Sequence, residues 1–145
     1  MPKLFVNLPV SDLQRSVEFF TRLGFTFDER FTDENATCML LGEDAYFMLL
    51  VEKFFKGFTS KDVSDTRSRA EAIFAIGVDS RAAVDDLAEK ALAAGAGPSM
   101  DPMDEMGMYG RSFADLDGHL WEVFFMDEAA MAAAASEQAG AAPQQ

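Results

Sequence analysis

The sequence has little positive charge, and this scarcity limits the partners that the protein can have. Its 145 residues include 12 basic and 25 acidic side chains, which gives a net charge of −13. A surface of this sign repels the phosphates of nucleic acids and of anionic lipid headgroups, so neither nucleic acid nor a membrane is expected as a partner. The simplest interpretation of the acidity is solubility, and the alternative is a site that attracts cationic ligands.

The sequence also lacks long apolar runs and cysteine pairs. No run approaches the roughly 18 apolar residues that cross a bilayer. The first ten residues, MPKLFVNLPV, do not have the apolar segment of a signal peptide. Cys38 is the only cysteine, so no internal disulfide can form, and its place in an apolar segment is typical of an inert core thiol. The expectation is a cytoplasmic protein with one domain.

The segment Leu4–Phe25 (LFVNLPVSDLQRSVEFFTRLGF) predicts a strand followed by a helix. Residues of the first part alternate, as in a strand, and Ser11 is the predicted residue that caps the helix. Leu13, Val17 and Phe20 then begin an apolar stripe at helical spacing. A second segment, Gly110–Phe124 (GRSFADLDGHLWEVF), predicts two strands around an Asp-Gly turn.

The order strand, helix, three strands occurs twice along the chain. The predicted modules span about residues 3–59 and about residues 71–127, and a polar linker at about residues 60–70 joins them. Residues 1–127 therefore form the predicted domain. The Ala-rich residues 128–145 are predicted to be a marginally ordered tail.

These two segments, in this order, resemble the vicinal oxygen chelate superfamily, which includes glyoxalase I, extradiol dioxygenases and bleomycin-resistance proteins. The resemblance covers roughly residues 3–127. It implies an α+β fold in which two βαβββ modules form a curved mixed sheet around a cleft, with the helices on the outside.

The resemblance also identifies where family members hold a metal. A histidine of metal-binding members corresponds to Phe5 here, and a second one corresponds to Ile73 within about one position. Glu122 matches a ligand of the last strand, but the first module has no carboxylate on its fourth strand before Glu52. Of the four ligands that metal-binding members have, this sequence has one, so we predict no metal site and no cofactor. His119 does not restore the site, because it has the opposite strand parity to Glu122.

The predicted ligand-binding residues are Phe5, Asn7, Ile73 and Glu122. Glu122 is a weak candidate for a general base or for a group that binds a cation, and the alternative is a carboxylate satisfied by a hydrogen bond. Asn7 either orients a ligand or bonds a neighbouring strand. We predict a salt bridge or surface contact for Arg111 and a hairpin cap for His119.

Two apolar groups allow more than one interpretation. One is the aromatic segment EKFFKGF, which is a lid, a dimer contact or part of the core: Phe54, Phe55 and Phe58. The other is a set of methionines that either adapt to a ligand or fill gaps in the core: Met100, Met103, Met106 and Met108.

The leading functional hypothesis is a homodimer that binds a small, largely apolar molecule in its cleft without the usual metal. The alternative is an enzyme of the same superfamily, of lyase or dioxygenase type, with a divergent site around Glu122. A purely structural or interaction role of the aromatic segment is a third possibility.

Overall fold

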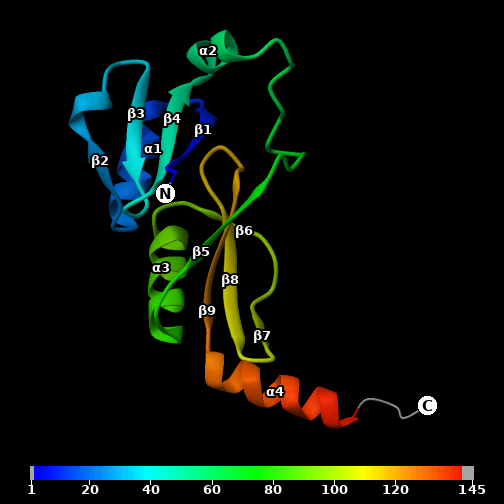
Figure 1. Ribbon diagram of the computed structural model, residues 1–145. Helices are drawn as coiled ribbons and strands as arrows, with labels where there is room; N and C mark the ends of the chain where they lie inside the picture. Colours follow the sequence, from blue (N-terminus) through cyan, green and yellow to red (C-terminus); the bar gives the residue numbers. More distant parts are fainter. Residues whose placement is uncertain (1, 142–145) are drawn as a thin grey trace.

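The computed structural model describes residues 2–141 of the chain, with side chains to Glu137, and folds them into two βαβββ modules joined by a linker (Figure 1). The first sheet has the strand order β1-β4-β3-β2. Its strands are β1 (Leu4–Val10), β2 (Thr26–Asp28), β3 (Ala36–Leu40) and β4 (Ala45–Val51). The second sheet has the order β5-β9-β8-β6, and β7 also pairs with β8. Its strands are β5 (Ile73–Gly77), β6 (Gly97–Pro98), β7 (Met103–Glu105), β8 (Met108–Ala114) and β9 (Leu120–Met126).

The pairing is the same in both modules. The first strand runs parallel to the last, β1 beside β4 and β5 beside β9, and the other pairs are antiparallel. Each module has one long helix, α1 (Leu13–Arg22) or α3 (Arg81–Ala93). The predicted α+β fold of two βαβββ modules is therefore confirmed. Between Phe58 and Ile73 the chain has no helix or strand, and the predicted linker lies in this segment.

One core joins the two modules. The only tryptophan, Trp121 of β9, is 1% exposed and lies among rings from the other elements. Its centroid is 5.4 Å from that of Phe20, 4.9 Å from that of Phe47 and 5.1 Å from that of Phe74. Phe20 and Phe47 belong to the first module, so the buried faces of both sheets pack on shared aromatic rings.

The start of α1 differs from the prediction. Asp12, not Ser11, caps the helix, because its carboxylate accepts the N–H of Arg15 at 3.1 Å. The N–H of Ser11 donates instead to Oδ1 of Asp117 at 2.8 Å, in the turn between β8 and β9. Ser11, the residue expected to cap the helix, therefore contacts the second module instead. Local sequence cannot predict a contact of this kind. For α3 the sequence predicts Ser80 or Asp79 as the cap, and the hydroxyl of Ser80 accepts the N–H of Ala83.

Two predicted strands are shorter than expected. The alternation of Phe25–Phe31 predicts a strand, but this strand ends at Asp28, and a 3-10 helix, η1 (Glu29–Phe31), follows it. The sequence also predicts a weak strand at Met100–Met103, and the structure has instead the short β6 and β7, which pair with opposite ends of β8. Pro98 and Pro102 have no N–H to donate, and this limits the pairing of the segment between them.

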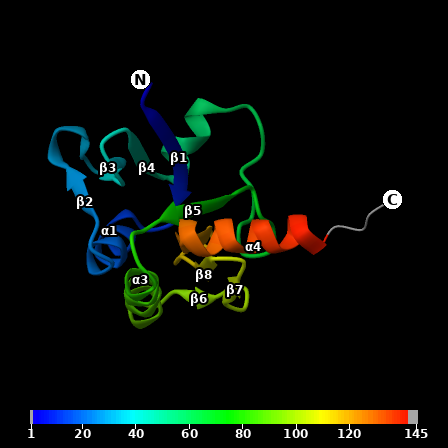
Figure 2. The same cartoon turned by 60° about the horizontal axis from the view of Figure 1, so that its bottom comes forward.

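The remaining helices follow the last strand of each module. After β4 the chain forms α2 (Glu52–Phe55) and a 3-10 helix, η2 (Lys56–Phe58). After β9 it forms α4 (Glu128–Ala141), which extends beyond the sheets in both views (Figures 1 and 2). The first part of the predicted tail is thus helical, and its residues 142–145 lie outside the described residues. No helix within residues 2–141 has the length and apolar character to span a membrane.

Candidate functional site

Each sheet has one face against the core and one face that no long helix covers. On β1 the residues Val6, Leu8 and Val10 pack into the core, so Phe5 and Asn7 lie on the opposite face. On β9 the residues Trp121 and Val123 are buried, and Glu122 lies on the opposite face. We call these two surfaces, opposite the core, the open faces of the sheets.

The four predicted site residues all lie on open faces. Phe5 is 52% exposed, and its ring stacks on that of Tyr46 with centroids 4.6 Å apart. Ile73 is 57% exposed and pairs in register with Leu120 of β9. Glu122 pairs with Ala75 of β5, two residues beyond Ile73 on the same face. Ile73 and Glu122 thus share the second sheet, whereas Phe5 and Asn7 share the first.

Asn7 and Glu122 line two different hollows that have no residue in common. The hollow beside Asn7 has a volume of about 190 Å³ and is also lined by Phe55, Glu71 and His119. The hollow beside Glu122 is larger, at about 440 Å³. Asn7 and Glu122 therefore line separate hollows, and the common role of the four predicted residues in binding stays a prediction.

The larger hollow, which we call the Glu122 hollow, lies on the open face of the second sheet. Its floor is formed by strands β5, β8 and β9, through Ala75, Gly110, Ser112, Glu122 and Phe124. Its wall is the segment that leads into β7 and the start of β8: Met100, Asp101, Met103 and Met108. Of the four methionines singled out in the sequence, three line this hollow, and they do not fill the core.

Ser112 holds the wall of the Glu122 hollow against its floor. The N–H of Met100 donates to Oγ of Ser112 at 2.8 Å, and this hydroxyl donates to the carbonyl oxygen of Met100 at 3.2 Å. Sequence patterns do not identify Ser112 or Asp101 as site residues, since strand periodicity does not reveal which distant segment covers a face. The alternation of β8 could have placed Ser112 beside Glu122, with which it pairs in register.

The charge in the Glu122 hollow is negative and unpaired. Within the described residues, neither Glu122 nor Asp101 makes a side-chain hydrogen bond or ion pair, so the alternative of a Glu122 carboxylate satisfied by a hydrogen bond is not found there. Arg111 also borders the hollow, but its guanidinium lies 3.3 Å from Oδ1 of Asp85 and 2.8 Å from Oε1 of Glu89 on α3. These carboxylates raise the pKa of Arg111 despite its partial burial. The salt bridge expected for Arg111 thus forms with α3.

The donor set around Glu122 does not suit a metal ion. Phe5 and Ile73 present only carbon, and Glu122 supplies one carboxylate. In the part of the chain that the structure describes, no three side chains of His, Cys, Asp or Glu gather closely enough to hold an ion. A divalent first-row metal requires about three or four such ligands.

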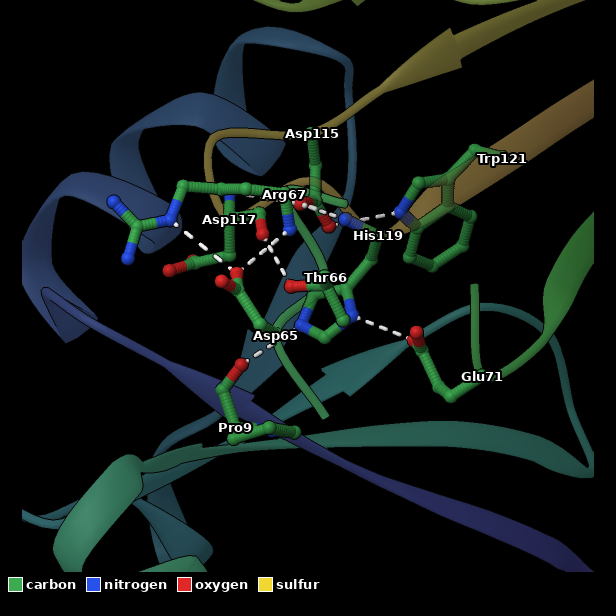
Figure 3. Close-up of polar contacts among 9 residues, drawn as sticks. All are labelled: Pro9, Asp65, Thr66, Arg67, Glu71, Asp115, Asp117, His119 and Trp121. Atoms are coloured by element: carbon green, nitrogen blue, oxygen red, sulfur yellow. Dashed lines mark hydrogen bonds and ion pairs between the residues drawn. The ribbon is translucent and has the colours of Figure 1, made fainter. Parts of the chain in front are cut away.

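His119 forms the centre of a polar junction between the modules (Figure 3). Its ring is 1% exposed. Nε2 donates to the carbonyl oxygen of Pro9, 2.8 Å away at the end of β1, and Nδ1 is 2.7 Å from Oε1 of Glu71 in the linker. The backbone N–H of His119 donates to Oδ1 of Asp115 at 3.0 Å. His119 is therefore more than the hairpin cap that was predicted, because it connects both modules and the linker.

Burial and the neighbouring carboxylates shift the pKa of His119 in opposite directions. Burial by itself would lower the pKa of His119, but the charges of Asp115 and Glu71 and the carbonyl of Pro9 raise it above the ordinary value. Burial raises the pKa of Asp115, and the charge of His119 and the indole N–H of Trp121, 2.9 Å from Oδ2, act in the opposite direction. With both ring nitrogens occupied, His119 is not free for catalysis or for metal binding.

The turn after β8 completes the junction. The hydroxyl of Thr66 in the linker donates to the carbonyl oxygen of Asp117. Gly118 has a φ of 87°, and a Cβ at this position would overlap the carbonyl oxygen of Thr66. Only glycine allows both the left-handed backbone and this close approach of the linker.

The aromatic segment and Cys38 lie outside the Glu122 hollow. Phe54 and Phe58 are 39% and 70% exposed and contact each other edge to face at 5.2 Å. The core interpretation of these two side chains is therefore wrong. Cys38 is buried on β3, and burial raises the pKa of its thiol, in agreement with the inert role expected for it.

Comparison with known proteins agrees with this geometry. Residues 3–42 match the family model described as bleomycin resistance protein-like N-terminal. No curated protein matches the chain.

Solved structures with the same fold cover most of the chain. A hypothetical protein from S. aureus is 26% identical, with a TM-score of 0.74, and the match covers 86% of this chain and 94% of that one. A glyoxalase/bleomycin resistance protein/dioxygenase family enzyme from Burkholderia phytofirmans is 17% identical, with a TM-score of 0.70 and coverage of 84% and 96%. A fosfomycin resistance protein from Listeria monocytogenes, solved with Mn(II) and sulfate, is 15% identical, with a TM-score of 0.65 and coverage of 88% and 92%.

Proposed function

We propose that the chain, whose fold is that of glyoxalase/bleomycin resistance/dioxygenase proteins, is a member of this superfamily and binds a small, largely apolar molecule at its open faces without a metal. The Glu122 hollow is the observation that carries this proposal. Its volume of about 440 Å³ lies within the roughly 300–1,000 Å³ typical of small-molecule pockets. Methionine side chains and one phenylalanine ring form most of its apolar surface, and methionine adapts its shape to irregular ligands.

We further propose that a second copy of the chain completes the cleft. The open faces expose large apolar side chains on both sheets, including Phe5 and Ile73, each more than half exposed. Exposed apolar surface of this kind is typical of an interface or a binding groove. A two-fold pairing would place an open face of one copy opposite an open face of its partner, with the ligand between them. The cytoplasm remains the expected location, on the grounds of the single cysteine.

An enzymatic function is the second candidate, and the unpaired carboxylate of Glu122 favours it. A carboxylate in an apolar hollow with no partner of its own is suited to remove a proton from a bound molecule. The neighbouring hydroxyl of Ser112 is already bonded to Met100, so Glu122 would have to act alone among the floor residues. Binding requires fewer functional groups in the site than catalysis does, so binding is the first candidate.

Equilibrium dialysis with the neutral probe N-phenylnaphthylamine tests the binding proposal. The wild type is expected to bind the probe saturably, and Ala75→Trp is expected to abolish this binding because the indole fills the floor of the Glu122 hollow. Ala82→Trp, at an exposed position of α3, is the matched control and should bind normally. Equal binding by both variants, or no saturable binding by the wild type, would overturn the proposal.

Sedimentation velocity tests the dimer. The wild type is expected to be a dimer at tens of micromolar, and Ile73→Lys to shift it toward monomer by placing a charge on the open face. Phe31→Lys is the control, because Phe31 has the same exposed fraction of 57% and lies in η1. A wild type that is monomeric at this concentration would exclude the pairing.

A further inference from the structure

We propose that the ligand of the Glu122 hollow is an apolar organic cation whose positive charge binds the carboxylate of Glu122. This inference rests on the proposed function and adds the chemical class of the ligand. An aromatic or branched aliphatic body that carries one ammonium group has the required chemistry.

The first argument is the arrangement of charges around the Glu122 hollow. Two carboxylates line it, those of Glu122 and Asp101, and within the described residues neither makes a side-chain hydrogen bond or ion pair. Among the described residues, Arg111 is the only basic one that borders the hollow, and two carboxylates of α3 hold its guanidinium. An anionic ligand would therefore meet repulsion, whereas a cation would meet two free partners.

Arg81, at the start of α3, is also engaged. The guanidinium of Arg81 forms two hydrogen bonds to Asp104 of β7, at 3.0 and 2.7 Å, and lies over the ring of Tyr109 at 4.1 Å from its centroid. On β8, Tyr109 and Arg111 have the opposite parity to Ser112, which pairs with Glu122. The charged side chains of β7, β8 and α3 thus pair with one another beside the hollow. Among the described residues, Glu122 has no side chain of opposite charge as a partner.

The second argument concerns desolvation. Glu122 lies among apolar side chains on an exposed face, where water now solvates its carboxylate. When a ligand or a second copy covers this face, the water leaves, and a carboxylate without a partner then strongly disfavours the covered state. A neutral ligand leaves this cost in place, and a cation removes it by pairing with the carboxylate.

The third argument is the chemistry of the walls. The faces of aromatic rings attract cations, and Phe124 provides such a ring on the floor. The polarizable thioethers of Met100, Met103 and Met108 accept the apolar body of a ligand of irregular shape. The net charge of −13 also raises the local concentration of cations at the protein surface.

The test uses two probes of the same shape that differ in charge. Benzyltrimethylammonium is a cation, and neopentylbenzene is its neutral counterpart, with carbon in place of nitrogen. Dialysis at low salt with the wild type, with Glu122→Gln and with Glu43→Gln measures both affinities. Glu43→Gln is the matched control, because it removes the same charge from the exposed turn between β3 and β4.

The wild type is expected to bind the cation at least about tenfold more tightly than the neutral probe. Glu122→Gln should abolish this preference, while leaving the affinity for neopentylbenzene equal or higher, and Glu43→Gln should preserve it. Retained binding of neopentylbenzene also shows that the variant is folded.

The outcomes separate the two proposals. Equal affinities for both probes, or a cation preference that survives in Glu122→Gln, would overturn the cationic ligand and leave apolar binding intact. If neither probe binds and N-phenylnaphthylamine does not bind either, both proposals are overturned. Preference for the cation in all three proteins would mean that the overall charge, and not Glu122, selects it.

Discussion

The carboxylates of the Glu122 hollow and of the His119 junction differ in burial and in hydrogen-bond partners. At the junction Asp115 is buried and accepts hydrogen bonds from two backbone N–H groups and from Trp121, beside a histidine with both ring nitrogens bonded. In the hollow Glu122 is exposed and has no partner within the described residues. The first arrangement is typical of groups that stabilise a fold, and the second is typical of groups that await a ligand.

The largest expected effect is loss of the junction. His119→Leu leaves the carboxylates of Asp115 and Glu71 without their cation, and breaking a buried pair in this way costs about 3–5 kcal/mol. Urea unfolding followed by the fluorescence of Trp121, which lies within the same junction, measures this change. A loss below about 1 kcal/mol would mean that the junction does not hold the modules together.

The next effect concerns the close approach of the linker to the turn. Gly118→Ala combines a left-handed backbone with an overlap on Thr66, so the free energy of unfolding should fall by about 1–3 kcal/mol. Gly24→Ala is the control, because Gly24 has a φ of 103° with no atom within 4 Å of the added Cβ. Equal losses in the two variants would show that backbone strain, and not the contact with the linker, determines the effect.

The pH dependence of stability reports the proton on His119. Its pKa is raised in the folded chain, so its contribution is complete below the unfolded value of 6.5 and is lost as the pH rises through the folded value. The free energy of unfolding should therefore decrease above about pH 6.5, by at most about 1.4 kcal/mol per pH unit. Unfolding by urea between pH 6 and pH 9 measures the slope. His119→Leu should remove it, and an unchanged slope would contradict the role of this proton.

The smallest effect is expected in the hollow. Glu122→Gln should change the free energy of unfolding by no more than about 0.5 kcal/mol, because an exposed carboxylate without partners contributes little to the fold. Urea unfolding of this variant and of His119→Leu under the same conditions measures the two changes in the free energy of unfolding. A large loss of stability would identify Glu122 as a structural residue, and the distinction drawn between the two regions would then be wrong.

The sequence predicts local features of this fold well. Segments on either side of a turn predict strands at Ala45–Val51 and Met108–Ala114, and the structure has both strands with these boundaries. Strand alternation also places Glu122 on the face opposite Trp121, since successive side chains of a strand point to opposite sides. The predictions fail where segments that are far apart in the sequence contact each other. His119 bonds Glu71 and Pro9, which lie 48 and 110 positions away, and no local pattern reveals such partners.

The same limit applies to the candidate site. The prediction identified Glu122 and the methionines separately, because each stands out by residue type. Their assembly into one hollow depends on the bond between Ser112 and Met100, 12 positions apart, and on the broken strand around Pro102. The resemblance to metal-binding relatives indicated that Phe5, Ile73 and Glu122 belong together. One chain places Phe5 on a different sheet from the other two, and strand parity alone does not determine how the two sheets face each other.

Methyl NMR of the protein labelled on its methionines tests directly whether the Glu122 hollow binds a small molecule. Titration with benzyltrimethylammonium should shift the methyl signals of Met100, Met103 and Met108, which line the hollow. The signal of Met39, which is fully buried in the core, should remain in place. Shifts confined to other methionines, or no saturable shift at all, would show that the hollow is not the binding site.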